Sequence, residues 1–100
     1  MDITKIKFEE RYDDKEFGIT NLYFIAPKEM LQNKYPEAEH MEICIELPTA
    51  FFDAEHASVQ FSPTKYNEIE RSYVDYDWFD AEITIQQIEE LLRLAESAAA

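Results

Sequence analysis

His40, Glu42 and Cys44 are the residues of this chain whose types and spacing come nearest to metal or nucleophile chemistry. They alternate along a stretch that is typical of a β-strand, so their side chains would share one face in steps of roughly 6.6–6.8 Å. Zinc ligands lie about 2.0–2.3 Å from the ion, so one ion cannot bind both ends of such a row without severe bending. We therefore predict no metal site and no cofactor.

Nucleophilic catalysis is also poorly supported. A reactive cysteine needs an electropositive setting that lowers the pKa of its thiol, whereas Cys44 is flanked by Glu42 and Glu46. A nucleophilic serine on a strand-to-helix elbow needs glycines, and Gly18 is the only glycine. Carboxylates are plentiful, but no pair stands out for general acid–base work. We predict that the protein is not an enzyme and has no catalytic residues, with a small carboxylate enzyme as the last alternative.

The stretch from Tyr73 to Asp80 points instead to recognition, since it holds four aromatic residues and three aspartates in eight positions. Read as a strand, it has two faces. One face, expected to pack inward, carries Val74, Tyr76, Trp78 and Asp80. The other, expected to be exposed, carries Tyr73, Asp75, Asp77 and Phe79. Aromatic side chains beside charges are typical of binding hot spots, although these aromatics would alternatively be core and the aspartates turn residues.

The net charge of −13 narrows the kind of partner. Residues 1–35 hold seven acids and six bases, while residues 36–100 hold fifteen acids and three bases, so the second part carries −12. Such a field repels nucleic acid and anionic membranes and favours a basic protein surface. High acidity for solubility alone is the competing explanation.

Length and composition predict one globular domain over residues 1–100, with 46% hydrophobic and 14% aromatic residues. The chain starts without an apolar run behind basic residues, which argues against a secretory signal. It also has no run of about eighteen apolar residues that would span a membrane. A single cysteine rules out an internal disulfide, so we predict a cytoplasmic protein.

Hydrophobic patterning predicts the elements of an α+β fold. Strands are expected over about 5–12 and 17–26, paired as an antiparallel hairpin, and over 40–47 and 57–61, the last ended by Pro63. A short helix is expected near residues 27–34, and residues 64–71 read as a loop or one helical turn. Residues 49–56 fit no period, although Phe51 and Phe52 are expected to be buried.

The last element is predicted to be an amphipathic helix that begins with a capping box of Thr84 and Gln87, flanked by a hydrophobic staple of Ile83 and Ile88. Its apolar stripe comprises Ile85, Ile88, Leu91, Leu92 and Ala95. We expect this stripe to cover the strand face made by Met41, Ile43, Ile45 and Leu47. The predicted fold is therefore a single antiparallel sheet of about 4–5 strands with the C-terminal helix packed on one face.

These features together predict a small acidic binding protein. It would inhibit a cationic nucleic-acid-handling protein, such as a nuclease toxin or a defence nuclease, by occluding its basic surface. That is the mode of an immunity protein, or of an anti-CRISPR inhibitor that mimics DNA, because strand carboxylates at this spacing loosely resemble successive phosphates. The predicted contact residues are Tyr73, Asp75, Asp77 and Phe79, with Glu42, Glu46 and Glu70 extending the field. The protein would be a monomer or homodimer, and the alternative function is a structural or adaptor subunit that homo-oligomerises.

Overall fold

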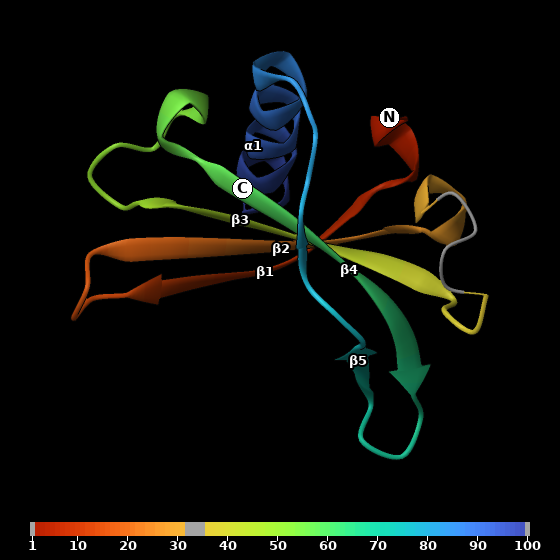
Figure 1. Cartoon of the computed structure of the whole chain (residues 1–100). Helices are drawn as coiled ribbons and strands as arrows, with labels where there is room; N and C mark the ends of the chain where they lie inside the picture. The colour runs from red at the N-terminus through yellow and green to blue at the C-terminus, as the bar shows by residue number, and fades with distance from the viewer. Residues whose placement is uncertain (1, 32–35, 100) are drawn as a thin grey trace.

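A computed structural model describes residues 2–31 and 36–99 and shows one curled antiparallel sheet with one long helix (Figure 1). The strands are β1 (Lys7–Asp14), β2 (Ile19–Pro27), β3 (His40–Pro48), β4 (Ser58–Asn67), β5 (Ser72–Asp75) and β6 (Phe79–Asp80). The helix is α1 (Ile85–Ala99), and short 3-10 helices are η1 (Ile3–Lys5), η2 (Lys28–Leu31) and η3 (Ala54–His56). The predicted α+β class is confirmed.

The strands follow the order β1-β2-β3-β4-β5, and every described pairing is antiparallel. The predicted hairpin of the first two strands is confirmed as β1 and β2. β6 adds a sixth strand by pairing with the first half of β4, while β5 pairs with its second half. The β4–β5 hairpin bends away from the rest of the sheet (Figure 1).

The prediction that Pro63 ends a short strand is wrong, because β4 runs through it to Asn67. The carbonyl of Pro63 accepts a hydrogen bond of 2.9 Å from the N–H of Tyr76, on the outer edge of β4. In an antiparallel strand the nitrogen and carbonyl of one residue face the same neighbour. The nitrogen of Pro63, which carries no hydrogen, therefore points to the side of β4 where β5 and β6 pair. No backbone hydrogen bond between β4 and β3 is lost.

The core lies between α1 and the sheet face that carries Met41, Ile43, Ile45 and Leu47, all fully buried. The capping box is confirmed: Thr84 N–H donates to Gln87 Oε1 at 2.9 Å, and Gln87 N–H donates to Thr84 Oγ1 at 3.1 Å. The apolar stripe is buried from Ile88 onward. Ile85 is the exception: it is the first residue of the helix and is 50% exposed.

Two further expectations concern the connecting segments. The helix expected near 27–34 is a 3-10 helix over Lys28–Leu31, and positions 32–35 lie outside the described residues. In the segment after β3, Phe52 packs against the core, with the Arg11 guanidinium 5.0 Å from its ring centre. Burial of Phe51 was predicted wrongly, since its exposed ring stacks on His56 at 5.0 Å.

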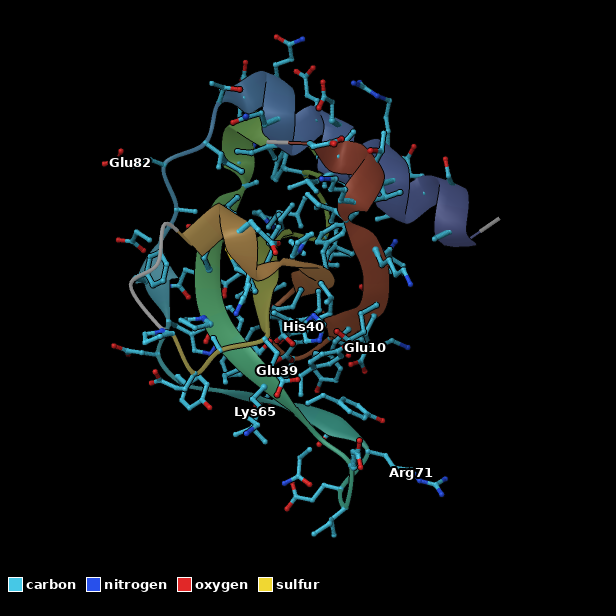
Figure 2. All side chains as sticks on the ribbon, turned by 90° about the vertical axis from the view of Figure 1, so that its right-hand side faces the viewer. Glu10, Glu39, His40, Lys65, Arg71 and Glu82 are labelled. Atoms are coloured by element: carbon cyan, nitrogen blue, oxygen red, sulfur yellow. The ribbon has the colours of Figure 1, made fainter. Side chains whose placement is uncertain are left out.

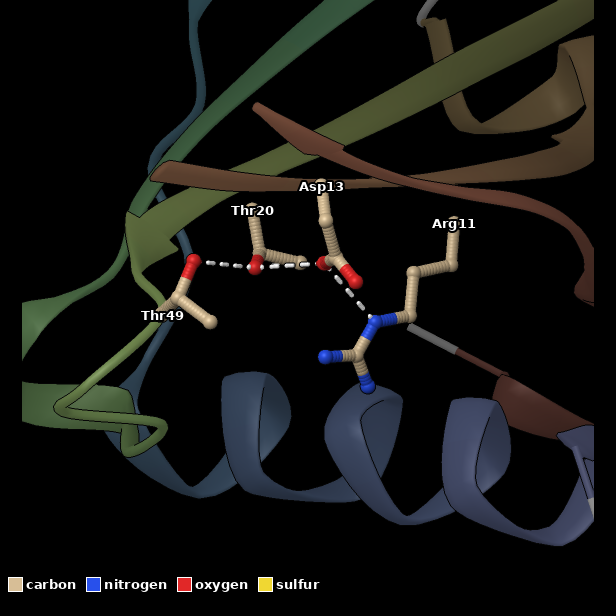
Figure 3. A network of polar contacts seen from close by, with 4 residues as sticks. All are labelled: Arg11, Asp13, Thr20 and Thr49. Carbon is tan, nitrogen blue, oxygen red and sulfur yellow. Dashed lines mark hydrogen bonds and ion pairs between the residues drawn. The ribbon is translucent and has the colours of Figure 1, made fainter. Parts of the chain in front are cut away.

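A small polar network lies on the helix side of the sheet, next to β1 and β2 (Figure 3). The hydroxyl of the fully buried Thr20 lies 2.8 Å from Asp13 and 2.8 Å from the Thr49 hydroxyl. Arg11 donates to the same Asp13 oxygen at 3.0 Å. The hydrogen bond from Thr20, followed by that from Arg11, lowers the pKa of Asp13. This charge is thus satisfied within the chain.

No helix in the described ranges is long and apolar enough to cross a membrane.

Candidate functional site

The candidate site lies on the sheet face opposite α1, where the strand register gathers acidic residues. Glu42 on β3 pairs with Ser62 on β4. Two residues further along β4, Thr64 pairs with Asp75 on β5. Paired residues of antiparallel strands project to the same face, so Glu42 and Asp75 share this face although 33 positions separate them in sequence.

β1 contributes its acids through an irregularity in its pairing. The register shifts between Phe8 and Glu10, which leaves Glu9 as an extra residue in the strand. Such a bulge redirects side chains locally, and both Glu9 and Glu10 line the same hollow. Glu10 pairs with Tyr23 on β2, which extends the acidic face across the sheet.

These strands enclose an open hollow with a volume of about 380 Å³. Its wall combines carboxylates with phenol rings and one hydroxyl: Glu9, Glu10, Tyr12, Tyr23, Glu42, Ser72 and Tyr73. Tyr73 is held in place by edge-to-face contacts with His40 at 5.3 Å and with Tyr66 at 5.2 Å. Figure 2 shows Glu10 and His40 on the side of the sheet away from α1.

Glu42 departs most from the sequence-based expectation. The alternation of residues 40–47 predicts that it faces water, yet it is only 8% exposed. The sheet curls, so that β4 and β5 bring Tyr73 and Asp75 over this end of β3. Its carboxylate makes no hydrogen bond or ion pair with any residue in the described part of the chain.

The surroundings of Glu42 oppose its ionisation. Burial, followed by the negative charges of Asp75, Glu9 and Glu10, raises the pKa of Glu42 to about 8. Partial burial also raises the pKa of Asp75, and partial burial followed by the charges of Glu10 and Asp75 raises the pKa of Glu9. The hollow therefore disfavours the ionised forms of its own carboxyl groups.

The neutral groups of the face are also poor acids. Burial, then the neighbouring Cys44, raises the pKa of Tyr23 to about 12. Burial is likewise the main reason why the pKa of Cys44 rises to about 11. The prediction that Cys44 is badly placed to form a thiolate is confirmed. No group of three or more potential ligands within residues 2–31 and 36–99 is arranged to hold a metal ion.

The ion pairs among residues 2–31 and 36–99 lie away from this face. Over the described residues there are two, Arg11 with Asp13 at 3.0 Å and His56 with Asp53 at 2.7 Å. Lys7 shares the face by its pairing with Ile25, but it forms no ion pair with a described carboxylate. The acidic face is thus left uncompensated by the part of the chain that the structure covers.

The sequence-predicted contact residues divide into two groups. Glu42, Tyr73 and Asp75 are brought together on the acidic face. The other members are dispersed. Asp77 lies exposed between β5 and β6, Glu46 is exposed at the far end of β3, and Glu70 is exposed in the β4–β5 turn.

The assumption of one continuous strand from Tyr73 to Asp80 is wrong, because β5 ends at Asp75 and β6 begins at Phe79. The expected exposure of Asp75 and Asp77 is confirmed, but the expected positions of Phe79, Val74 and Tyr76 are wrong. Phe79 packs against the core, with an edge-to-face contact of 6.2 Å to Phe61, whereas Val74 and Tyr76 are exposed.

Sequence reasoning missed most of the wall of the hollow, namely Glu9, Glu10, Tyr12, Tyr23 and Ser72. The adjacent glutamates of β1 interrupt the alternation of polar and apolar residues. That interruption is the one local sign of a bulge, and only the register with β2 shows where it directs the side chains.

The β4–β5 hairpin presents an apolar surface beside the acidic hollow. Tyr66, Ile69, Val74 and Tyr76 are exposed there, Ile69 at 95%, and they line a second, apolar depression of about 490 Å³. The turn is held by the Asn67 side chain, which accepts from the N–H groups of Ile69 at 2.9 Å and Glu70 at 3.1 Å. Arg71, labelled near the far end of the hairpin in Figure 2, adopts a left-handed conformation with φ 53°. Ile69 is therefore exposed on an ordered turn.

No family model, curated protein or solved structure matches this chain.

Proposed function

We propose that this protein binds a basic surface of another protein and inhibits a nucleic-acid-handling partner by occluding that surface. The single observation that carries the proposal is Glu42, a residue only 8% exposed, which lines the acidic hollow, shares a face with Glu9, Glu10 and Asp75 and has no cationic partner among the described residues. Ionising a largely buried carboxyl beside other acids and without a cation is costly. A cation supplied by a bound protein removes that cost.

The charge distribution supports attraction of a basic partner over a distance. Residues 36–100 carry −12, and a field of this size attracts a basic protein from solution and speeds association at low salt. Nucleic acid is repelled by the same field, so a partner whose basic surface normally binds nucleic acid fits the charge pattern best.

The β4–β5 hairpin supplies the apolar contribution that a stable interface needs. Tyr66 connects the two regions, because it lines the apolar depression and its ring contacts Tyr73 of the acidic hollow. Aromatic and aliphatic anchors beside charged groups are the usual composition of binding hot spots. The proposed interface therefore extends from the hollow to Ile69.

The test is capture of partners from lysate at about 50 mM and 150 mM salt, a range over which exposed charge interactions are screened progressively. Each captured protein is then assayed for nucleic-acid binding or cleavage with and without the acidic protein. We expect a basic protein that is retained better at low salt and inhibited on binding. Failure to retain a basic protein under either condition, or retention without inhibition, would contradict the proposal.

A second candidate function is a structural subunit that self-associates through the β4–β5 hairpin. The 95% exposure of Ile69, together with the surrounding apolar depression, favours it. Sedimentation velocity at micromolar concentration separates the two functions. A concentration-dependent dimer that is lost in Ile69→Ser supports self-association. A monomer at all concentrations contradicts self-association and favours a different protein as the partner of the hairpin.

A further inference from the structure

The hollow on the acidic face has the features of a site for one organic cation. Its volume of about 380 Å³ falls within the roughly 300–1,000 Å³ of small-ligand sites. Carboxylates from β1 and β3 face it from two sides, and the rings of Tyr12, Tyr23 and Tyr73 complete its wall. It is open to solvent, so a side chain from another molecule can enter it.

Two polar groups on this face make no hydrogen bond within the described chain, and one of them, Glu42, lines the hollow. Glu42 is 92% buried, lines the hollow and has no hydrogen-bond partner within the described chain. The Thr64 hydroxyl, fully buried on the same face opposite Asp75, also has no partner there. Thr64 Oγ1 is fully enclosed, whereas the oxygens of Glu42 remain reachable from the hollow, so Glu42 is the group that a ligand there would contact.

We propose that this hollow binds the guanidinium group of an arginine side chain, with Glu42 as its main carboxylate and the tyrosine rings as its walls. A guanidinium is planar, carries five N–H donors that match carboxylates in pairs, and stacks on aromatic rings. An ammonium is more strongly hydrated and lacks the planar face, so it fits the same wall less well.

This inference rests on the proposed function only for the source of the arginine, which would be the basic surface of the partner. Binding of a free guanidinium to the hollow does not depend on any protein partner. A titration with a small guanidinium therefore tests the hollow, while capture of a basic protein tests the wider function, and either can fail without the other.

Ionisation of Glu42 makes the affinity depend on pH. The titratable groups that face it are Glu9 and Glu10 from β1, Tyr23 from β2, His40 and Cys44 on β3, and Tyr73 and Asp75 from β5. Lys7 shares the face but forms no ion pair with Glu42 within the described residues. Since burial and the neighbouring acids raise the pKa of Glu42 to about 8, a cation must displace its proton at neutral pH. The affinity should rise about tenfold per pH unit from 6 to 8 and level off above 8.

The experiment is an NMR titration at constant ionic strength with n-propylguanidinium and n-butylammonium, which are monocations that mimic arginine and lysine side chains. Glu42→Gln removes the carboxylate of the hollow, and Glu46→Gln is the matched control, because it removes the same charge from the same strand outside the hollow. Glu10→Gln is a second variant in the wall, in case Glu42→Gln alters the fold. We expect n-propylguanidinium to bind the native protein and Glu46→Gln equally. Binding should be at least tenfold weaker in Glu42→Gln and severalfold weaker in Glu10→Gln.

Several results would overturn the inference. They are the absence of saturable guanidinium binding, equal affinities of Glu42→Gln and Glu46→Gln, equal affinities for the two cations, and a flat pH profile between 6 and 8. Displacement of n-propylguanidinium by stoichiometric Mg²⁺ would also contradict it, since the hollow would then be a metal site.

Discussion

Glu42 on β3 and Asp75 on β5 lie on the same face of the sheet with β4 between them, and burial followed by the charge of Asp75 raises the pKa of Glu42 to about 8. The two carboxylates converge because the sheet curls, which brings its last strand over the end of β3. Like charges held together in this way oppose folding unless a cation joins them. The same relationship underlies the predictions on stability and on binding.

The first prediction concerns stability and pH. The pKa of Glu42 is about 8 when folded against an ordinary value of 4.5, so the folded state binds more protons than the unfolded state between these values. Stability therefore falls as pH rises from about 4.5 to about 8, because the folded state must release the proton that it holds. Glu42→Gln should remove most of this loss. Urea unfolding at pH 5 and pH 8.5 measures it, and parallel pH profiles for the two proteins would refute the prediction.

The second prediction concerns partner binding. Asp75→Lys combined with Asp77→Lys should abolish capture of the basic partner while leaving the fold intact, because both residues are exposed and one borders the acidic hollow. Glu89→Lys combined with Glu96→Lys on exposed positions of α1 changes the net charge equally and serves as the control. Isothermal titration calorimetry measures the affinity of each double variant for the captured partner. Equal losses in the two double variants would show that only net charge matters.

The third prediction concerns the apolar tip of the β4–β5 hairpin. Ile69→Ser should change the free energy of unfolding by no more than about 0.5 kcal/mol, because this side chain is 95% exposed. It should nevertheless weaken the interface by at least about tenfold, as expected for an anchor residue worth more than about 1 kcal/mol. Surface plasmon resonance with the captured partner measures this. Unchanged dissociation would exclude the hairpin from the interface.

The fourth prediction concerns the core under α1. Leu91 is fully buried, so Leu91→Ala should lower the free energy of unfolding by about 2–5 kcal/mol. The matched control is Ile85→Ala on the same helix, where half of the side chain is already exposed and the loss should be much smaller. Chemical denaturation of both variants gives the comparison. Similar losses would mean that α1 covers the sheet with a different face.

The fold was predictable where a local pattern determines an element. The strict alternation of polar and apolar residues predicted β3 to within one residue of its observed end. The capping box of Thr84 and Gln87 predicted the start of α1, where the structure shows the reciprocal hydrogen bonds. The end of β4 was predicted wrongly at Pro63. The sequence does not show toward which neighbouring strand the nitrogen of this proline points, because that depends on strand pairing. The break after Asp75 was missed for the same reason, since β5 and β6 pair with different halves of β4.

The candidate site was predictable only in part. Tyr73 and Asp75 were identified from composition, and Glu42 from its place in an acidic strand. The burial of Glu42 could not be foreseen, because it arises from the curl of a sheet whose strands lie far apart in sequence. Glu9 and Glu10 were missed since their shared position depends on a bulge defined by the register with β2.

The most direct test of the central claim is a site-specific NMR titration of the Glu42 carboxyl, with and without saturating n-propylguanidinium. The free protein should show a midpoint at about pH 8, and the ligand should lower it by at least one unit, because a cation favours the ionised form. A midpoint near the ordinary value of 4.5 in the free protein, or one that the guanidinium leaves unchanged, would contradict the claim that Glu42 awaits a cation from outside the chain.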